Sequence, residues 1–428
     1  MRWVFLLLAS CTLPSLPSVD PVILSGQGCG RATAYDNANK ILTSKGKTHV
    51  TWLDSVGGKF LVRIKTLDNA NATWSETTAV GESVDNHGGP ALTIDSAGHL
   101  HIVYHPHHHP VCYRRSVRPD DASAWGPIEH VGNRATYPSL ICGADDTLYL
   151  AVRESHSKAP WRLNLYSKRA DEPWSPPTTL LTARGPGYCQ FGQNLASSND
   201  GTLHLSLWVY EDHDADRLKT TIGYLRSADG GVNWSKGDGT PVALPTDTTK
   251  IDVIAHHPPQ AGIVRGGAMA IDAKGSPHLF YRSLRDWPGE LIHADLQPSG
   301  KWRKRGLGMR TDNRRDPRQI IEAVSASIDT SGRILLGLMT LDVGHENPER
   351  GWGDPRHEVG WSVSEDGGET WISEAITATD PEAARWLPSI ERATGHNRVI
   401  RPAMIYTDGG RGDSNKDMMS NRVIFLRR

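Results

Sequence analysis

Short apolar segments alternate with polar turns along most of the chain, and the turns usually carry glycine or aspartate. Residues 41–52 form one such unit, with Gly46 at its turn, and residues 91–104 form another, with Gly98 at its turn. Alternation of apolar and polar positions on both sides of a polar turn predicts a pair of antiparallel strands. Each unit is therefore expected to contain a β-hairpin.

The hairpin unit recurs often enough to indicate a repeat architecture. Its turns lie at Gly46, Gly98, Asp145-Asp146, Gly201, Gly275, Gly332 and Gly395. Tryptophan recurs after the paired strands, where an outer strand would begin, at Trp74, Trp125, Trp174, Trp234, Trp302 and Trp371. The spacing leaves room for four short strands in each repeat. We predict an all-β fold, a seven-bladed β-propeller whose last blade is completed by the other terminus; the alternative is six blades with a divergent C-terminal extension.

Two of these tryptophans end sequences typical of Asp-box hairpins, SADGGVNW at 227–234 and SEDGGETW at 364–371. Such hairpins occur on the rims of sialidase-like propellers. The aspartate caps N–H groups of the turn, and the tryptophan packs beneath it. A structural role is therefore predicted for Asp229 and Asp366.

Composition and charge narrow the function classes. The 428 residues include 42 glycines and 27 prolines, which favours many short strands over long helices. With 47 basic and 48 acidic residues the net charge is −1, so nucleic acid and anionic membrane surfaces are not expected partners. An anionic ligand must be held by a local basic site. We expect a monomer.

The first 20 residues are interpreted as an export signal. Met1-Arg2 precedes an apolar run from Trp3 to Ser10, and the small residues before Cys11 also fit a lipoprotein signal. The protein is thus expected to be secreted, periplasmic or lipid-anchored, with 21–428 as a single propeller domain. The remaining cysteines are expected in one or two disulfides or as a thiol on a metal: Cys29, Cys112, Cys142 and Cys189.

Nineteen histidines are present, and seven of them fall between positions 87 and 109. In a propeller, the loop that enters the innermost strand and the loop between the second and third strands open on one face, around the central channel. In the second repeat these loops are 85–90 and 105–110, so His87 should meet His107 or His108. The other four histidines of this stretch are assigned to strand or loop packing: His99, His101, His105 and His109.

The same rule places residues from the following repeats on this face of the propeller, around the central channel. Tyr137 lies in the loop 135–138, and Arg153 lies at the end of the next strand. The fourth repeat enters through Tyr188, and the fifth through Arg265. Polar residues on such loops converge on a pocket.

Histidine, tyrosine and arginine together suit β-elimination on a uronic acid. The proton at C5, next to the carboxylate, becomes acidic enough to remove when a cation neutralises the carboxylate. Tyrosine or histidine can act as base, and tyrosine can then protonate the departing oxygen at C4. Ordinary glycoside hydrolysis uses two carboxylic acids instead. The elimination requires no cofactor.

Three motifs lie close together, DNHGGPAL at 85–92, HHHP at 107–110 and YRRS at 113–116, and Tyr137 follows them sixteen residues before Arg153. In these features the chain resembles the BNR-repeat propeller polysaccharide lyases, which include ulvan lyases and rhamnose-glucuronate lyases. The partner implied is an anionic polysaccharide that contains uronate.

The resemblance also implies roles for individual residues. Tyr137 would be the base and also the acid, and His87 would share the base or neutralising role. Arg153 and one of His107 or His108 would hold the carboxylate. Substrate contacts would come from Asn86, Tyr188 and Arg265, and a structural zinc would be bound through His156 and Cys189.

Two other functions stay open. A sialidase-type hydrolase shares the Asp boxes but needs an arginine triad, for which the candidates are Arg265, Arg315 and Arg318; no Arg-Ile-Pro motif accompanies them. A non-catalytic carbohydrate-binding propeller would present stacking aromatic residues and would not need a cluster of histidine, tyrosine and arginine.

Overall fold

The computed structural model describes residues 19–211, 219–257, 262–312, 317–342, 353–378 and 382–428. Within these ranges every regular element is a strand, so the all-β prediction is confirmed. The described part of the chain accordingly has no helix of the length and apolar character needed to span a membrane. The predicted export signal lies outside the described residues except for Val19 and Asp20, which begin the first strand.

The strands form five antiparallel sheets, of which the largest has nine strands and joins the two ends of the chain. It contains β1 (Val19–Gly28), β2 (Ile41–Ser44), β3 (Lys47–Val56), β4 (Lys59–Asp68), β5 (Thr73–Trp74), β6 (Thr78–Ser83), β29 (Arg385–Ile390), β30 (Ala403–Asp408) and β31 (Asn421–Arg427). The second sheet contains β7 (Ala91–Ile94), β8 (Leu100–Tyr104), β9 (His107–Arg118), β10 (Asp121–Trp125), β11 (Glu129–Cys142), β12 (Leu148–Glu154), β13 (Arg162–Lys168) and β14 (Thr178–Thr182).

The other three sheets follow in chain order. The third contains β15 (Cys189–Ser197), β16 (Leu203–Glu211), β17 (Lys219–Ser227), β18 (Trp234–Ser235), β19 (Pro241–Val242) and β20 (Asp252–His257). The fourth contains β21 (Ile263–Ile271), β22 (Pro277–Leu284), β23 (Glu290–Leu296) and β24 (Trp302–Gly306). The fifth contains β25 (Arg318–Ile328), β26 (Ile334–Asp342), β27 (Glu358–Ser364) and β28 (Ile372–Ala375).

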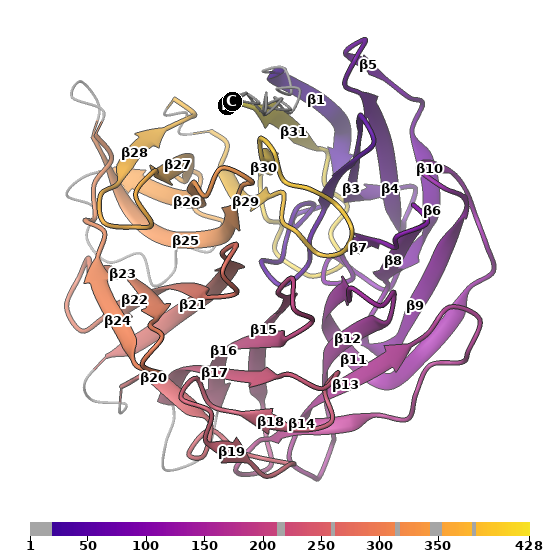
Figure 1. The fold of residues 1–428 in the computed structure, drawn as a ribbon. Helices are drawn as coiled ribbons and strands as arrows, with labels where there is room; N and C mark the ends of the chain where they lie inside the picture. Colours follow the sequence, from indigo (N-terminus) through magenta and orange to yellow (C-terminus); the bar gives the residue numbers. More distant parts are fainter. Residues whose placement is uncertain (1–18, 212–218, 258–261, 313–316, 343–352, 379–381) are drawn as a thin grey trace, which may run out of the picture.

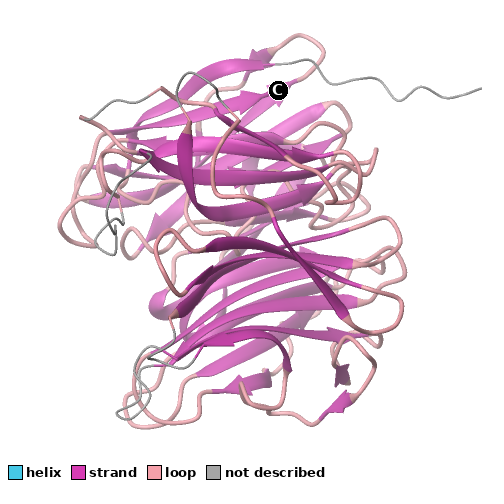
Figure 2. Cartoon of the chain, turned by 90° about the vertical axis from the view of Figure 1, so that its left-hand side faces the viewer, coloured by secondary structure: helices cyan, strands magenta, loops and turns pink. Residues whose placement is uncertain are grey.

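The sheets are arranged in sequence order around a common centre (Figure 1). In the side view their strands run in layers across the molecule (Figure 2). Each predicted turn lies between two paired strands, from Gly46 between β2 and β3 to Gly395 between β29 and β30. As expected, the N-terminal strand completes the sheet of the C-terminal strands, because β1 pairs with β31.

Apolar clusters lie between neighbouring sheets. Leu163 of β13 shares a cluster with Phe191 of β15, and Tyr224 of β17 shares one with Leu279 of β22. The outer tryptophans extend these contacts: the ring of Trp302 lies 5.1 Å from that of Tyr224 in an edge-to-face arrangement. Since each sheet buries apolar side chains against its neighbours, the fold is held together by sheet-to-sheet packing.

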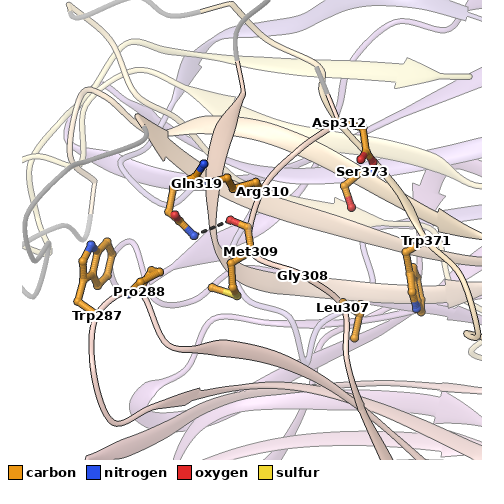
Figure 3. A pocket seen from close by; sticks show the side chains of 10 residues that line it. All are labelled: Trp287, Pro288, Leu307, Gly308, Met309, Arg310, Asp312, Gln319, Trp371 and Ser373. Carbon is orange, nitrogen blue, oxygen red and sulfur yellow. Dashed lines mark hydrogen bonds between the residues drawn. The ribbon is translucent and has the colours of Figure 1, made fainter. Parts of the chain in front are cut away.

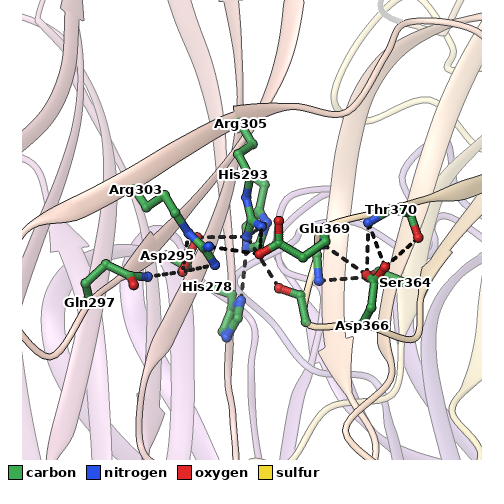
Figure 4. Close-up of polar contacts among 12 residues, drawn as sticks. His278, His293, Asp295, Gln297, Arg303, Arg305, Ser364, Asp366, Glu369 and Thr370 are labelled. Atoms are coloured by element: carbon green, nitrogen blue, oxygen red, sulfur yellow. Dashed lines mark hydrogen bonds and ion pairs between the residues drawn. The ribbon is translucent and has the colours of Figure 1, made fainter.

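The Asp-box aspartates are structural, as predicted. Asp366 accepts hydrogen bonds from the hydroxyl of Ser364 (2.8 Å) and the backbone N–H of Thr370 (2.9 Å), and Asp229 repeats this pattern in its own box. In the same hairpin Glu369 forms ion pairs with Arg303 and Arg305 from the neighbouring sheet (Figure 4). The box therefore also links two sheets.

Two details differ from the sequence-based expectations. Cys29, Cys112, Cys142 and Cys189 are all free and buried, so the predicted disulfides among them are wrong. The segments 107–110 and 135–138 are parts of the long strands β9 and β11 and not loops. Both strands are interrupted by irregular register where they pair, which turns side chains out of the normal alternation.

Candidate active site

Segments that are far apart in the sequence converge on one cavity of about 380 Å³. The connection between β1 and β2, the connection between β6 and β7, and strands β11, β21 and β25 all contribute to its wall. Its polar and aromatic lining includes Arg31, Tyr35, Asp36, His87, Tyr137, Tyr188, Gln190, Arg265 and Glu322. Four residues predicted from the sequence, His87, Tyr137, Tyr188 and Arg265, are thus brought together.

His87 is held by a tight turn between β6 and β7. A Cβ atom at Gly88 would lie 2.6 Å from the carbonyl oxygen of His105 and 2.7 Å from the hydroxyl of Ser83, so only glycine fits there. Asp85 accepts a hydrogen bond from the backbone N–H of His87 at 2.8 Å. The turn therefore fixes where the His87 imidazole enters the cavity.

A single carboxylate orients two imidazoles. Asp85 Oδ1 lies 3.2 Å from Nδ1 of His87, and its Oδ2 lies 2.5 Å from Nδ1 of His107. The two imidazole rings stack with their centroids 4.0 Å apart. Burial opposes the charge on Asp85, but hydrogen bonds from His107 and His87 outweigh it and hold the pKa of this carboxyl well below its usual range. Asp85 is therefore an ionised acceptor for both rings.

His87 is neutral near neutral pH. Burial lowers its pKa to about 4; the hydrogen bond to Asp85 works against this, and the charge of Arg31 adds to it. Its Nε2 contacts Nη1 of Arg31, which can only donate. The arrangement fits a tautomer with hydrogen on Nδ1 toward Asp85 and a lone pair on Nε2 toward Arg31.

The structure separates the two histidines that the sequence left ambiguous. His107 bonds to Asp85 and stacks on His87. His108 instead places Nδ1 2.6 Å from the hydroxyl of Ser155. His107, which is not itself among the cavity-lining residues, is thus the one that adjoins His87.

Tyr137 reaches the cavity because its strand is irregular. The register of β11 against β12 shifts between Thr136 and Ser139, and Tyr137 has a φ of 59°, which is unusual for a residue other than glycine. Its ring lies edge-on to Tyr35 at 4.8 Å between centroids and 6.2 Å from His87. Burial raises the pKa of Tyr137, while the charge of Arg153 works against this rise.

Arg153 is not among the residues that line the cavity, and its predicted contact with the substrate carboxylate stays a prediction. It is only 1% exposed, and its guanidinium carbon lies 4.5 Å from the ring centroid of Tyr137, 4.8 Å from that of Trp161 and 5.5 Å from that of Tyr188. It therefore lies behind the aromatic wall as a cation–π partner. A sequence places an arginine near a site but does not reveal which aromatic rings cover it.

Arg31 and Tyr35 were missed by the sequence analysis. Nη1 of Arg31 donates to Tyr35 Oη at 2.6 Å, and both residues line the cavity. They lie in the connection from β1 to β2, which enters the first repeat just as 85–90 enters the second. Applying the entering-loop rule to the first repeat would have found them.

The remaining predicted contacts differ in position. Tyr188 is 43% exposed at the cavity, whereas Asn86 is buried and does not line it. Of the sialidase-type arginines, Arg265 lines the cavity, Arg318 is buried with an ion pair to Asp342 (2.6 Å), and Arg315 lies outside the described residues. The described residues therefore do not assemble that triad.

Among the residues that the structure describes, neither residue proposed for zinc belongs to a larger donor cluster. Within the described ranges, the groups of three donor side chains are Asp85-His87-His107 and Cys142-Asp146-His396. Neither contains His156 or Cys189, and burial raises the pKa of the Cys189 thiol well above its usual value. These two residues alone do not fit a tetrahedral zinc site. The zinc stays a prediction without support from the geometry.

A family model and two curated relatives match parts of this chain. A family model described as "BNR repeat-containing family member" matches residues 47–310. An ulvan lyase of Nonlabens ulvanivorans is 30% identical over 117 residues, which are 23% of this chain and 24% of the relative. Ulvan Lyase-PL25 of Pseudoalteromonas sp. (strain PLSV) is 28% identical over 106 residues, 21% of each chain. The chain thus aligns with about a quarter of the length of these curated relatives.

Solved structures extend the similarity of fold to nearly the whole chain. A PL25 ulvan lyase superposes with a TM-score of 0.70 at 15% identity and covers 96% of both chains. The same statistics hold for that enzyme bound to -[GlcA(1-4)Rha3S]-. The polysaccharide lyase Uly1 superposes with a TM-score of 0.62 at 12% identity, covering 97% of this chain and 99% of its own.

Proposed function

The chain belongs to the BNR repeat-containing family, and we propose that it is a polysaccharide lyase. It would cleave the bond to C4 of a uronic acid by β-elimination, in a rhamnose-glucuronate polysaccharide of the ulvan type. The observation that carries this proposal is the meeting of a neutral histidine, a protonated tyrosine and an arginine in one cavity: His87, Tyr137 and Arg31. The ulvan lyases among its relatives support the choice of substrate.

Two arginines line the cavity, Arg31 and Arg265, and we assign the uronate carboxylate to Arg31 because it contacts His87. It lines the cavity next to His87 and Tyr35, whereas Arg153 is covered by aromatic rings. Neutralising the carboxylate makes the neighbouring C5–H bond more acidic, because negative charge develops on the carboxylate as the proton leaves. His107 is hydrogen-bonded to Asp85 beside the same site.

The protonation states favour one division of labour between base and acid. The Nε2 lone pair of neutral His87 faces Arg31 in the structure. When Arg31 pairs with the uronate carboxylate instead, this lone pair accepts the proton at C5, and the electron pair of that C–H bond forms the double bond between C4 and C5. The bond from C4 to its oxygen breaks, and Tyr137, whose raised pKa keeps it protonated, donates its proton to that oxygen. The products are an unsaturated uronate and a chain with a new hydroxyl group.

We further propose that the strands form seven blades. Seven hairpin turns recur along the chain, β1 completes the C-terminal strands, and the sheets follow one another around a centre (Figure 1). The order of the five sheets around that centre, from the first repeat to the last, supports a closed ring of repeats (Figure 1). The mouth of the channel would then be the catalytic face. Export from the cytoplasm would bring the enzyme to a substrate that is too large to enter a cell.

Product analysis tests the proposal. The protein is incubated with ulvan, with gum arabic and with a polysaccharide that lacks uronate, and the unsaturated uronate is followed by ultraviolet absorbance and mass spectrometry. Elimination yields products that together weigh as much as the substrate, while hydrolysis adds one water for each bond cleaved. Unsaturated products from a uronate polymer alone are expected. New reducing ends without unsaturation would replace the lyase with a hydrolase, for which Asp36 and Glu322 are the carboxyl groups at the cavity.

A further inference from the structure

A second hollow, of about 650 Å³, lies beside the fifth sheet. Its walls come from the connection between β22 and β23, the connection between β24 and β25, and the start of β28 (Figure 3). Its side chains include Trp287, Leu307, Met309, Arg310, Gln319 and Trp371. We refer to it as the distal groove.

The distal groove and the catalytic cavity share a wall. Strand β25 contributes Gln319 to the groove and Glu322 to the cavity. Trp287 packs against an apolar cluster that contains Ala34 and Leu387, both of which line the cavity. The groove therefore adjoins the cavity along β25.

The loop that carries Trp287 is fixed in place by Arg282. Nε of Arg282 donates to the carbonyl oxygen of Pro288 at 3.0 Å, and its Nη1 donates to that of Ile321 at 2.8 Å. The same guanidinium lies 4.7 Å from the Trp287 ring centroid. The indole is thus held in position before any ligand arrives, which reduces the entropy lost on binding.

The groove combines an aromatic surface with a cation. Arg310 is exposed and, among the described residues, has no ion-pair partner. The carboxylate of Asp312 accepts a hydrogen bond from the backbone N–H of Ser373 at 2.6 Å, so this acid has a structural role. An indole face suits the C–H face of a sugar ring, and a guanidinium suits a carboxylate or sulfate group.

We propose that the distal groove is a second binding site for the polysaccharide, in which Trp287 stacks on a sugar ring and Arg310 pairs with an anionic group of the same chain. The proposal rests on the proposed function for the identity of the ligand. It predicts that long chains, which fill both the cavity and the groove, bind more tightly than short ones.

The test compares Arg310→Ala and Trp287→Ala with the control Arg169→Ala, which removes an exposed arginine far along the chain from the groove. Affinity electrophoresis in gels containing ulvan measures binding without catalysis. Steady-state kinetics give the ratio of kcat/KM on ulvan to kcat/KM on a tetrasaccharide prepared from it. Both groove variants are expected to weaken gel retardation and to lower that ratio about tenfold, while the control changes neither.

Each outcome bears on a different claim. Unchanged retardation and an unchanged kinetic ratio in Arg310→Ala would overturn the distal site, even with lyase activity intact. Arg310 is exposed, so this variant stays informative if Trp287→Ala, which loses apolar packing, fails to fold. Retardation that depends on Arg310 in a protein without lyase activity would keep the distal site and reject the proposed reaction.

Discussion

Replacing the carboxylate that serves both imidazoles gives the sharpest test of the site. In Asp85→Asn the side chain keeps its shape, but one of its two oxygens becomes an NH₂ group, which donates and does not accept. The amide can accept a proton from only one of the two Nδ1 atoms, at His87 or at His107. The other imidazole must rotate or change its tautomer.

The magnitude follows from the hydrogen bond that is lost. A hydrogen bond to a charged group contributes about 1.5–3 kcal/mol, and the His107 bond at 2.5 Å is short. Because each 1.36 kcal/mol in the activation barrier is a factor of ten, kcat/KM should fall about tenfold to a hundredfold. The charge of Asp85 raises the pKa of His87, so replacing it with a neutral amide should lower that pKa further.

The assay follows unsaturated uronate formation from ulvan, and the unfolding temperature is measured alongside it. The matched control is Asp95→Asn, because Asp95 accepts from the backbone N–H of His99 at 2.7 Å and lies 3.1 Å from Nε2 of His101, outside the cavity. The control should lose stability but keep its rate. Wild-type kcat/KM in Asp85→Asn, or an equal loss of rate in both variants, would refute the orienting role of Asp85.

Two further predictions address the same site, and a third addresses buried histidines in several parts of the chain. Tyr137→Phe should lower kcat at least about a hundredfold while gel retardation by ulvan and the unfolding temperature stay near wild type, because only the proton donor is lost; near-normal turnover would remove Tyr137 from the chemistry. Arg31→Ala should lower kcat/KM and move the acid limb of the pH–rate profile to higher pH, since the charge of Arg31 lowers the pKa of His87; an unmoved limb would contradict their coupling. His49, His87 and His204 each have a pKa of about 4 against 6.5 for the free side chain, mainly through burial. The unfolded chain therefore binds more protons between these values, so the unfolding temperature should drop as pH falls from 6.5 toward 4, and a flat profile there would show that these rings are not held neutral.

The hairpins and outer strands could be predicted because their signals are local. Gly98 permits its turn with a φ of 96°, and the apolar alternation on both sides sets which residues are buried. The tryptophans mark outer edges because a large ring is needed to cover the adjacent sheet, as Trp302 does with Tyr224. None of this depends on distant parts of the chain.

The candidate site was predicted less completely. His87, Tyr137, Tyr188 and Arg265 follow from the order of loops in a repeat, and the structure brings them to one cavity. The choice between adjacent histidines could not follow, because a one-residue shift on β9 points a side chain to a different neighbour.

The sequence by itself determined the kind of element, the repeat and the residue types available at one end of the strands. Only the tertiary structure decided which cations face the cavity: Arg31 and Arg265 line it, while Arg153 is covered by the ring of Tyr137. It also brought Asp85 into contact with two imidazoles and set Trp287 beside a groove. The burial of these groups and the interactions between their charges depend on contacts between residues of different sheets. Local sequence patterns carry no information about those contacts.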